Sequence, residues 1–135
     1  MQVNKVSDKY SVAGQILPAD VAALKEAGFG TIICNRPDGE AEGQPPVAEI
    51  AQAAAAAGLA FEHNPIESGA PTPEAVARQG ELCAAADAPV FAYCASGKRS
   101  TMLWTLANPE GLDADERLSC AEAAGYDFEA LRPQL

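Results

Sequence analysis

The sequence has few basic residues and no long apolar run. It holds nine lysines and arginines against nineteen aspartates and glutamates, so its formal net charge at pH 7 is −10. Nucleic acids and anionic membranes bind proteins through basic patches, and this composition therefore predicts neither as a partner. No stretch approaches the ~20 apolar residues of a membrane span, and residues 1–10 lack the apolar core of a signal peptide. We therefore expect a cytoplasmic protein.

The sequence also has little that would hold a metal or form a disulfide framework. His63 is its single histidine, and its four cysteines are widely spaced with no C-x-x-C pair. This spacing favours neither a zinc site nor a set of disulfides. Cys83 and Cys120 fall within helical patterns and Cys34 ends an apolar strand, so we expect all three in the core. We predict no metal and no cofactor.

Apolar strand patterns alternate with helical patterns along the chain. The predicted strands are residues 10–15, 30–34, 59–66 and 89–93, and the predicted helices are residues 18–27, 46–57, 72–86, 102–107, 113–125 and 127–131. This order predicts a single α/β domain over residues 1–135, in which helices cover both faces of a parallel sheet of about four to five strands. Ligands bind such sheets at the carboxyl ends of the strands, where loops 35–45, 67–71 and 94–100 would meet.

The most informative segment is the loop after the last predicted strand. An apolar run ends at Cys94, a short Gly-containing turn follows, and Arg99 precedes the next helical pattern. Backbone N–H groups converge in such a turn, and the helix dipole adds positive potential that favours both a bound anion and a thiolate. Cys94 is therefore a candidate nucleophile and Arg99 a candidate oxyanion contact. The remaining residues of the predicted anion-binding loop are Ala95, Ser96, Gly97, Lys98 and Ser100.

Two enzyme classes use a cysteine and an arginine in this way. Cysteine-dependent phosphatases attack phosphorus, and rhodanese-type sulfurtransferases attack a sulfane sulfur. Tyrosine-phosphatase loops have five residues between the two side chains, whereas many rhodanese-like loops have four. Four residues separate Cys94 from Arg99 here. The short loop therefore favours the sulfurtransferase class over the phosphatase class.

Five stretches, of which one is this loop, together resemble a known protein family. They are SVAGQ at 11–15, ICNRPDGE at 33–40, NPI at 64–66, YCASGKRS at 93–100 and AGYD at 124–127. Together they resemble the bacterial phosphatase-like domain family of beta-lactamase-hydrolase-like proteins, from about residue 10 to residue 135. The resemblance implies a protein-tyrosine-phosphatase-like fold, similar to dual-specificity phosphatases. It also implies a domain that occurs alone or fused to sulfide- or persulfide-oxidising enzymes.

The sequence departs from true phosphatases after the third predicted strand. Those enzymes carry an aspartic acid there, which protonates the leaving group, and residues 65–71 contain none. Glu67 is a candidate replacement. Asp38 is either a turn residue, an alternative acid, or a group that orients Arg36 or Arg99. Arg36 is either a second oxyanion contact or a structural partner of Asp38.

Three functions remain open from the sequence. The leading hypothesis is sulfur transfer, in which Cys94 takes a sulfane sulfur from thiosulfate or a small persulfide and passes it to a thiol acceptor, such as glutathione or a thiol protein. Cys34, which we expect in the core, is a further candidate for an internal acceptor. The alternatives are hydrolysis of phosphate monoesters through a cysteinyl-phosphate, and a non-catalytic thiol sensor or anion-binding module. Ser100 would either donate a hydrogen bond to the Cys94 thiolate or cap the helix. We expect a small anionic substrate as the partner of an enzymatic reaction at Cys94.

Overall fold

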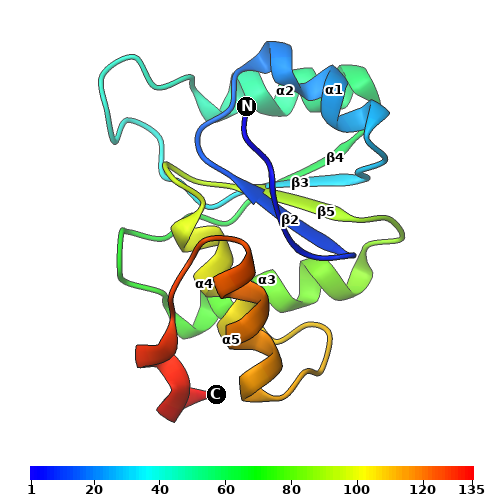
Figure 1. The fold of residues 1–135 in the computed structure, drawn as a ribbon. Helices are drawn as coiled ribbons and strands as arrows, with labels where there is room; N and C mark the ends of the chain where they lie inside the picture. Colours follow the sequence, from blue (N-terminus) through cyan, green and yellow to red (C-terminus); the bar gives the residue numbers. More distant parts are fainter.

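Five short strands form the central sheet of the computed structural model, which describes residues 1–135 (Figure 1). They are β1 (Asn4–Ser7), β2 (Tyr10–Ala13), β3 (Thr31–Cys34), β4 (Ala60–His63) and β5 (Val90–Tyr93). The order in the sheet is β1-β2-β5-β3-β4, with β1 antiparallel to β2 and the other neighbours parallel. The predicted α/β fold is confirmed. β5 lies at the centre of the sheet, so the cysteine that follows it leaves the middle of the carboxyl edge.

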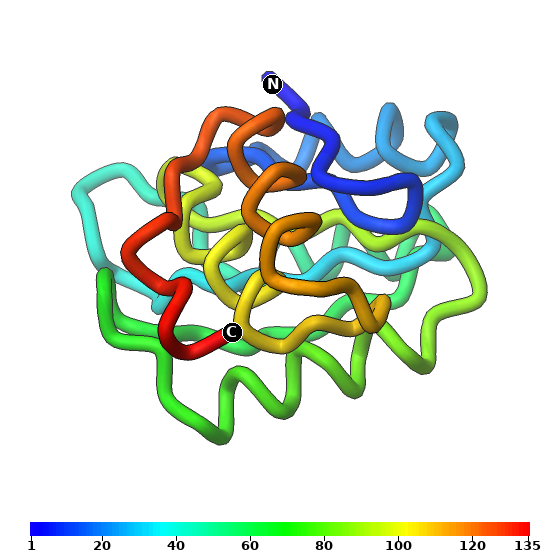
Figure 2. The backbone as a smooth tube through the Cα atoms, turned by 60° about the horizontal axis from the view of Figure 1, so that its bottom comes forward, coloured from blue at the N-terminus to red at the C-terminus, as the bar shows by residue number.

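The helices divide between the two faces of the sheet (Figure 1). One face carries α1 (Val21–Glu26) and α2 (Val47–Ala57), and the other carries α3 (Pro73–Ala85), α4 (Lys98–Ala107) and α5 (Ala114–Ala123). Two 3-10 helices, η1 (Pro18–Asp20) and η2 (Glu129–Gln134), complete the chain. Figure 2 shows α5 in orange crossing α4 in yellow, and α5 also contacts β1. None of the helices is long and apolar enough to cross a membrane.

Alternation along the strands separates two apolar clusters. Ile32, Phe91 and Tyr93 pack with α1 and α2, whereas Ile33 and Ala92 belong to the cluster on the opposite face. A strand with both faces covered is apolar throughout, which is why β3 and β5 are recognisable in the sequence. Trp104 is buried in the second cluster.

Local signals set most of the helix boundaries. The Thr72 hydroxyl accepts a hydrogen bond from the Ala75 N–H at 3.1 Å, and Asp113 accepts one from the Glu116 N–H at 2.8 Å. Gly58, with φ of 80°, ends α2 in the left-handed conformation that glycine adopts without strain. These three predicted helix ends are confirmed.

The sequence prediction is wrong at both ends of the chain. No strand is predicted before residue 10, yet β1 pairs with β2 along the edge of the sheet. Only Val6 of its four residues is buried, so the strand carries no apolar pattern. The last helix is a 3-10 helix over Glu129–Gln134 rather than a helix over 127–131. Pro133 lacks an N–H group, so it cannot extend an α-helical ladder.

Candidate active site

Cys94 lies directly after β5, and α4 begins four residues later at Lys98. Its side chain has no solvent exposure, and the Gly97 N–H points at the Cys94 Sγ with a donor–acceptor distance of 3.1 Å. Gly97 has φ of 86°, in the region that favours glycine. Residues 94–100, called the cysteine loop below, therefore form the predicted strand–turn–helix arrangement with a backbone donor on the sulfur.

The end of β2 supports the cysteine loop from one side. The Gln15 N–H donates to the Ala95 carbonyl oxygen at 3.4 Å, and the Cys94 N–H donates to the Ala13 carbonyl oxygen at 3.4 Å. A Cβ atom at Gly14 would lie 2.8 Å from the Ala95 oxygen, closer than real Cβ contacts allow. Gly14 therefore permits the close approach of the two backbones.

Arg99 is held by a carboxylate from a distant part of the chain. Its Nη1 and Nη2 atoms donate to the two carboxylate oxygens of Glu40 at 2.8 and 2.9 Å, and Nη1 also donates to the Ile66 carbonyl oxygen at 3.0 Å. A guanidinium has five N–H donors, so Nε–H and one Nη2–H remain. These two donors share one edge of the group and suit a bidentate contact with an oxyanion.

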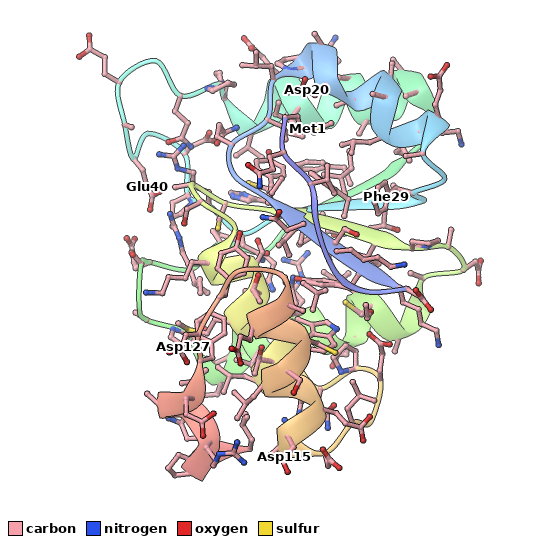
Figure 3. The ribbon with its side chains drawn as sticks, viewed as in Figure 1. Met1, Asp20, Phe29, Glu40, Asp115 and Asp127 are labelled. Atoms are coloured by element: carbon pink, nitrogen blue, oxygen red, sulfur yellow. The ribbon has the colours of Figure 1, made fainter.

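Glu40 lies on the long loop between β3 and α2, at the same carboxyl edge of the sheet as the turn into α4 (Figure 3). Hydrogen bonds from Arg99, reinforced by Arg36, lower the pKa of Glu40 to about 2, although partial burial opposes them. Glu40 in turn raises the pKa of Arg99. The two side chains are therefore both charged at neutral pH. The sequence analysis did not identify Glu40 as a site residue, because Glu40 lies 59 positions before Arg99 in the chain. The only signal was its place in the ICNRPDGE stretch.

Arg36 and Asp38 do not pair with each other. Arg36 donates through Nε to Glu40 at 2.8 Å and through Nη1 to the Gln15 side chain at 3.0 Å. Asp38 is exposed and accepts a hydrogen bond from the Val47 N–H at 2.8 Å, at the start of α2. Asp38 is thus a turn residue, which is one of the roles predicted for it. Glu40 rather than Asp38 orients the two arginines.

Glu67 and Ser100 have different surroundings, and only Ser100 has a partner that the sequence did not predict. Glu67 is exposed in a turn whose backbone closes on Ala70 at 3.0 Å, and its carboxylate makes no hydrogen bond or ion pair. Ser100 is fully buried in the first turn of α4, and its hydroxyl donates to the Asn35 side-chain oxygen at 2.8 Å. That hydroxyl therefore neither caps the helix nor bonds to Cys94.

Ser100 belongs to a buried polar network beneath the cysteine loop. The Gln79 side chain from α3 accepts from Asn35 and Asn64, both at 2.9 Å, and donates to the Tyr10 hydroxyl at 3.0 Å. The Tyr10 hydroxyl donates in turn to the Ser100 carbonyl oxygen at 2.7 Å. The network joins the ends of β3 and β4 to the start of α4, so it fixes three loops of the carboxyl edge relative to one another.

His63, Cys34, Cys83 and Cys120 do not line the pocket beside the cysteine loop, and their contacts are with the backbone and the core. His63 Nε2 lies 2.9 Å from the Arg36 carbonyl oxygen. Cys34 Sγ contacts the same oxygen at 3.3 Å, and burial raises the pKa of this thiol. Cys34 packs in the α1–α2 cluster. Burial also raises the pKa of Cys83, to about 12, and that of Cys120. These three cysteines are therefore thiols rather than thiolates at neutral pH.

A pocket of about 170 Å³ opens beside the cysteine loop. It is called the loop pocket below, and its lining consists of Ser68, Gly69, Ala95, Ser96, Lys98, Arg99 and Met102. None of these residues is acidic, although the protein has a net charge of −10. Lys98 is exposed and forms no ion pair. A larger pocket of about 240 Å³, beside Tyr10 and Trp104, contains no residue of the cysteine loop. The loop pocket is thus a small cavity whose charged lining is entirely cationic.

Residues 2–111 match the family described as beta-lactamase hydrolase-like protein, phosphatase-like domain. The chain belongs to this family. A beta-lactamase hydrolase-like protein of Agrobacterium fabrum is 34% identical over 125 residues, which cover 93% of this chain but 28% of the relative. The family domain is therefore a minor part of that longer protein.

Solved structures support the same family and the same fold. The crystal structure of nma1982, a phosphatase candidate from Neisseria meningitidis, is 35% identical, has a TM-score of 0.84, and is matched over 99% of this chain and 96% of that one. Kinase-associated phosphatase, solved with a serine in place of its catalytic-site cysteine, has a TM-score of 0.73 at 14% identity, over 98% and 89% of the two chains. The second likeness concerns the fold alone. The predicted family and the phosphatase-like fold are confirmed.

Proposed function

We propose that the chain hydrolyses phosphate monoesters through a cysteinyl-phosphate on Cys94. The observation that carries the proposal is the joint geometry of the cysteine loop. A backbone donor lies 3.1 Å from the Cys94 sulfur, and Arg99 keeps two donors on one edge of its guanidinium free while Glu40 holds the other edge. The likeness to phosphatases supports phosphorus as the atom attacked.

The reaction takes place in two displacement steps. The Cys94 thiolate attacks phosphorus, the S–P bond forms, and the ester P–O bond breaks so that the leaving oxygen takes the electron pair. Loop N–H groups and Arg99 bind the three phosphoryl oxygens and stabilise their charge in the transition state. Water then attacks phosphorus, the S–P bond breaks, and inorganic phosphate leaves together with one proton.

The loop pocket has no carboxyl group that could serve as the general acid for the leaving group. Its lining contains no carboxylic acid, and Glu40 is ionised at neutral pH because its pKa is about 2. Loss of a general acid typically lowers a rate ~10²–10⁴-fold. We therefore expect aryl phosphates, whose leaving groups depart as stable anions, to react far faster than alkyl phosphates.

Hydrolysis of p-nitrophenyl phosphate by the wild type, Cys94→Ser and Cys83→Ser tests the proposal. We expect Cys94→Ser to lose activity by on the order of 10³-fold or more, since the nucleophile is removed. Cys83→Ser is the matched control and should keep wild-type kcat/KM. Mass spectrometry after rapid acid quenching should find a phosphoryl group on Cys94. Full activity in Cys94→Ser would disprove the mechanism.

Sulfur transfer is the second candidate, because the four-residue loop and the missing acid both favour it. The Cys94 thiolate would attack the outer sulfur of thiosulfate, forming one S–S bond while the bond to sulfite breaks. Sulfite leaves without a proton donor. A thiol such as glutathione, or a thiol protein, would then accept the sulfur.

The same preparations distinguish the candidates when they are incubated with thiosulfate and cyanide. Thiocyanate formation that exceeds phosphate release, and one added sulfur on Cys94, would favour sulfur transfer. A reactive Cys94 without turnover in either assay would favour the thiol sensor or anion-binding module.

A further inference from the structure

Tyr126 contacts the cysteine loop from a segment that the proposed reaction does not involve. The segment follows α5 and passes the start of α4, and Figure 3 labels Asp127, the next residue, on it (Figures 1 and 3). The Tyr126 hydroxyl donates to the Ser96 carbonyl oxygen at 2.9 Å and accepts from the Asn4 side-chain amide at 3.3 Å. The single hydroxyl proton of Tyr126 is therefore donated to the cysteine loop, at the Ser96 carbonyl oxygen.

The bonded carbonyl belongs to the same peptide group as the donor on Cys94. The C=O of Ser96 and the N–H of Gly97 flank one planar peptide bond, and in a trans peptide they point in opposite directions. Tyr126 holds the oxygen on the outer side, while the N–H lies 3.1 Å from the Cys94 sulfur on the inner side. Rotation of this peptide would break both hydrogen bonds together.

Gly97 makes this orientation possible and also makes it reversible. Its φ of 86° and ψ of −10° suit glycine, and a Cβ atom at this position would overlap the Tyr126 hydroxyl. Because glycine adopts many backbone conformations, residue 97 does not by itself prevent rotation of the preceding peptide. An outside contact is needed to select one orientation.

We infer that Tyr126 is a positioning residue that fixes the Ser96–Gly97 peptide so that its N–H stabilises the Cys94 thiolate. The inference rests on the proposed role of Cys94 as the nucleophile. Tyr126 acts through the peptide and touches neither the sulfur nor the substrate. Its ring is held in place by stacking on Phe128, with centroids 6.4 Å apart and planes 8° from parallel.

Tyr126→Phe tests the inference, because it removes the hydroxyl and keeps the stacked ring. The measurement is the rate of Cys94 alkylation by iodoacetamide as a function of pH, with the modified cysteine identified by mass spectrometry. We expect the midpoint of the rate–pH curve to rise by about 0.5–1 unit, and the rate at neutral pH to fall about 3–10-fold, as loss of a hydrogen bond to a thiolate requires. Hydrogen exchange at the Gly97 N–H should become faster.

Tyr93→Phe is the matched control. The Tyr93 hydroxyl is buried, has no hydrogen-bond partner, and lies in the α1–α2 cluster on the other face of the sheet. Its removal should leave the alkylation curve of Cys94 unchanged.

The outcomes separate this inference from the proposed function. A wild-type Cys94 no more reactive than free cysteine would overturn the nucleophile assignment, and this inference with it. A reactive wild type whose alkylation curve and Gly97 exchange are unchanged in Tyr126→Phe would overturn the inference alone. A lower melting temperature with an unchanged curve would also overturn it, because Tyr126 would then be structural only.

Discussion

Arg99 donates three hydrogen bonds within the protein, two to Glu40 and one to the Ile66 carbonyl oxygen. Two effects follow at the scale of this residue. The bonds lower the rotational freedom of a long side chain, and they turn the free edge of the guanidinium in one direction. The cation is therefore preorganised for an anion rather than recruited by one.

Replacing Glu40 with glutamine should disturb this arrangement without changing the size of the side chain. The amide has one acceptor oxygen in place of two and points an N–H₂ group at the cation. For Glu40→Gln we expect kcat/KM toward p-nitrophenyl phosphate to fall on the order of 10–100-fold, since small misplacements of catalytic groups have effects of this size. Urea unfolding should show a loss of roughly 1–3 kcal/mol.

The control for this substitution is Glu42→Gln. Glu42 is exposed on the same loop and makes no hydrogen bond through its side chain. It should behave as the wild type in both measurements. A Glu40→Gln protein with lowered stability but unchanged kcat/KM would show that the carboxylate is structural and does not position Arg99 for the reaction.

Among the elements, α3 is linked to the carboxyl edge of the sheet most extensively through the buried side chain of Gln79. Gln79 has no solvent exposure and bonds to Asn35, Asn64 and Tyr10. Asn35 follows β3, and Asn64 follows β4. The position of α3 is thereby linked to the loops that surround Cys94, although α3 itself contributes no residue to the loop pocket.

Gln79→Leu should be strongly destabilising, because it removes a hydrogen bond from each of three buried polar side chains, those of Asn35, Asn64 and Tyr10. We expect a loss of about 2–5 kcal/mol in urea unfolding. Arg78→Leu is the control on the same helix: Arg78 pairs with Glu62 at 3.0 Å on the exposed surface. Its loss should cost roughly 1 kcal/mol or less. Equal losses in the two variants would contradict the role of the buried network.

The sequence predicts the features that are local in the chain. The cysteine loop lies within seven consecutive residues, so its turn, its glycine and its helix start can be recognised together. The bond from Arg99 to Glu40 spans 59 positions, and that from Tyr126 to Ser96 spans 30. Such contacts depend on which loops the sheet order brings together. That order, β1-β2-β5-β3-β4, is not written in any single stretch.

Ser100 shows why a residue type in the expected place can still mislead. A hydroxyl next to an arginine at a helix start suits either a cap or a bond to the thiolate, and the sequence cannot reveal a third partner. Asn35 lies on an adjacent strand end and presents an acceptor 2.8 Å away. Buried hydroxyls bond to the nearest acceptor with good geometry, which here comes from another loop.

At the scale of the whole molecule, charge controls how stability responds to acid. The net charge of −10 disfavours the compact state at neutral pH through self-repulsion, and this repulsion declines toward the sequence pI of about 4.4. The Glu40 carboxyl has its pKa lowered from 4.5 to about 2 by the arginines. The stabilisation by this carboxylate is therefore fully present above about pH 4.5 and is lost as the pH falls toward 2.

Melting temperatures measured from pH 7 to pH 2.5 should reflect both effects. We expect stability to hold or rise as the pH is lowered from 7 to about 5, and then to fall in more acidic solution. The difference between wild type and Glu40→Gln should be constant above pH 5 and shrink below pH 4.5. A difference that persists undiminished at pH 2.5 would contradict the assigned ion pair.

The Tyr126 hydroxyl, which donates to the Ser96 carbonyl oxygen of the cysteine loop, also accepts a hydrogen bond from Asn4, 122 positions away in the sequence. A tag or domain fused to either end of this chain can therefore affect the cysteine loop. A purification tag or a fused domain that displaces β1 would remove one partner of the Tyr126 hydroxyl, and one that strains the segment after α5 would move Tyr126 itself. Differences in activity between differently tagged proteins would then reflect changes in the hydrogen bonds among Asn4, Tyr126 and Ser96 as well as the properties of the active site.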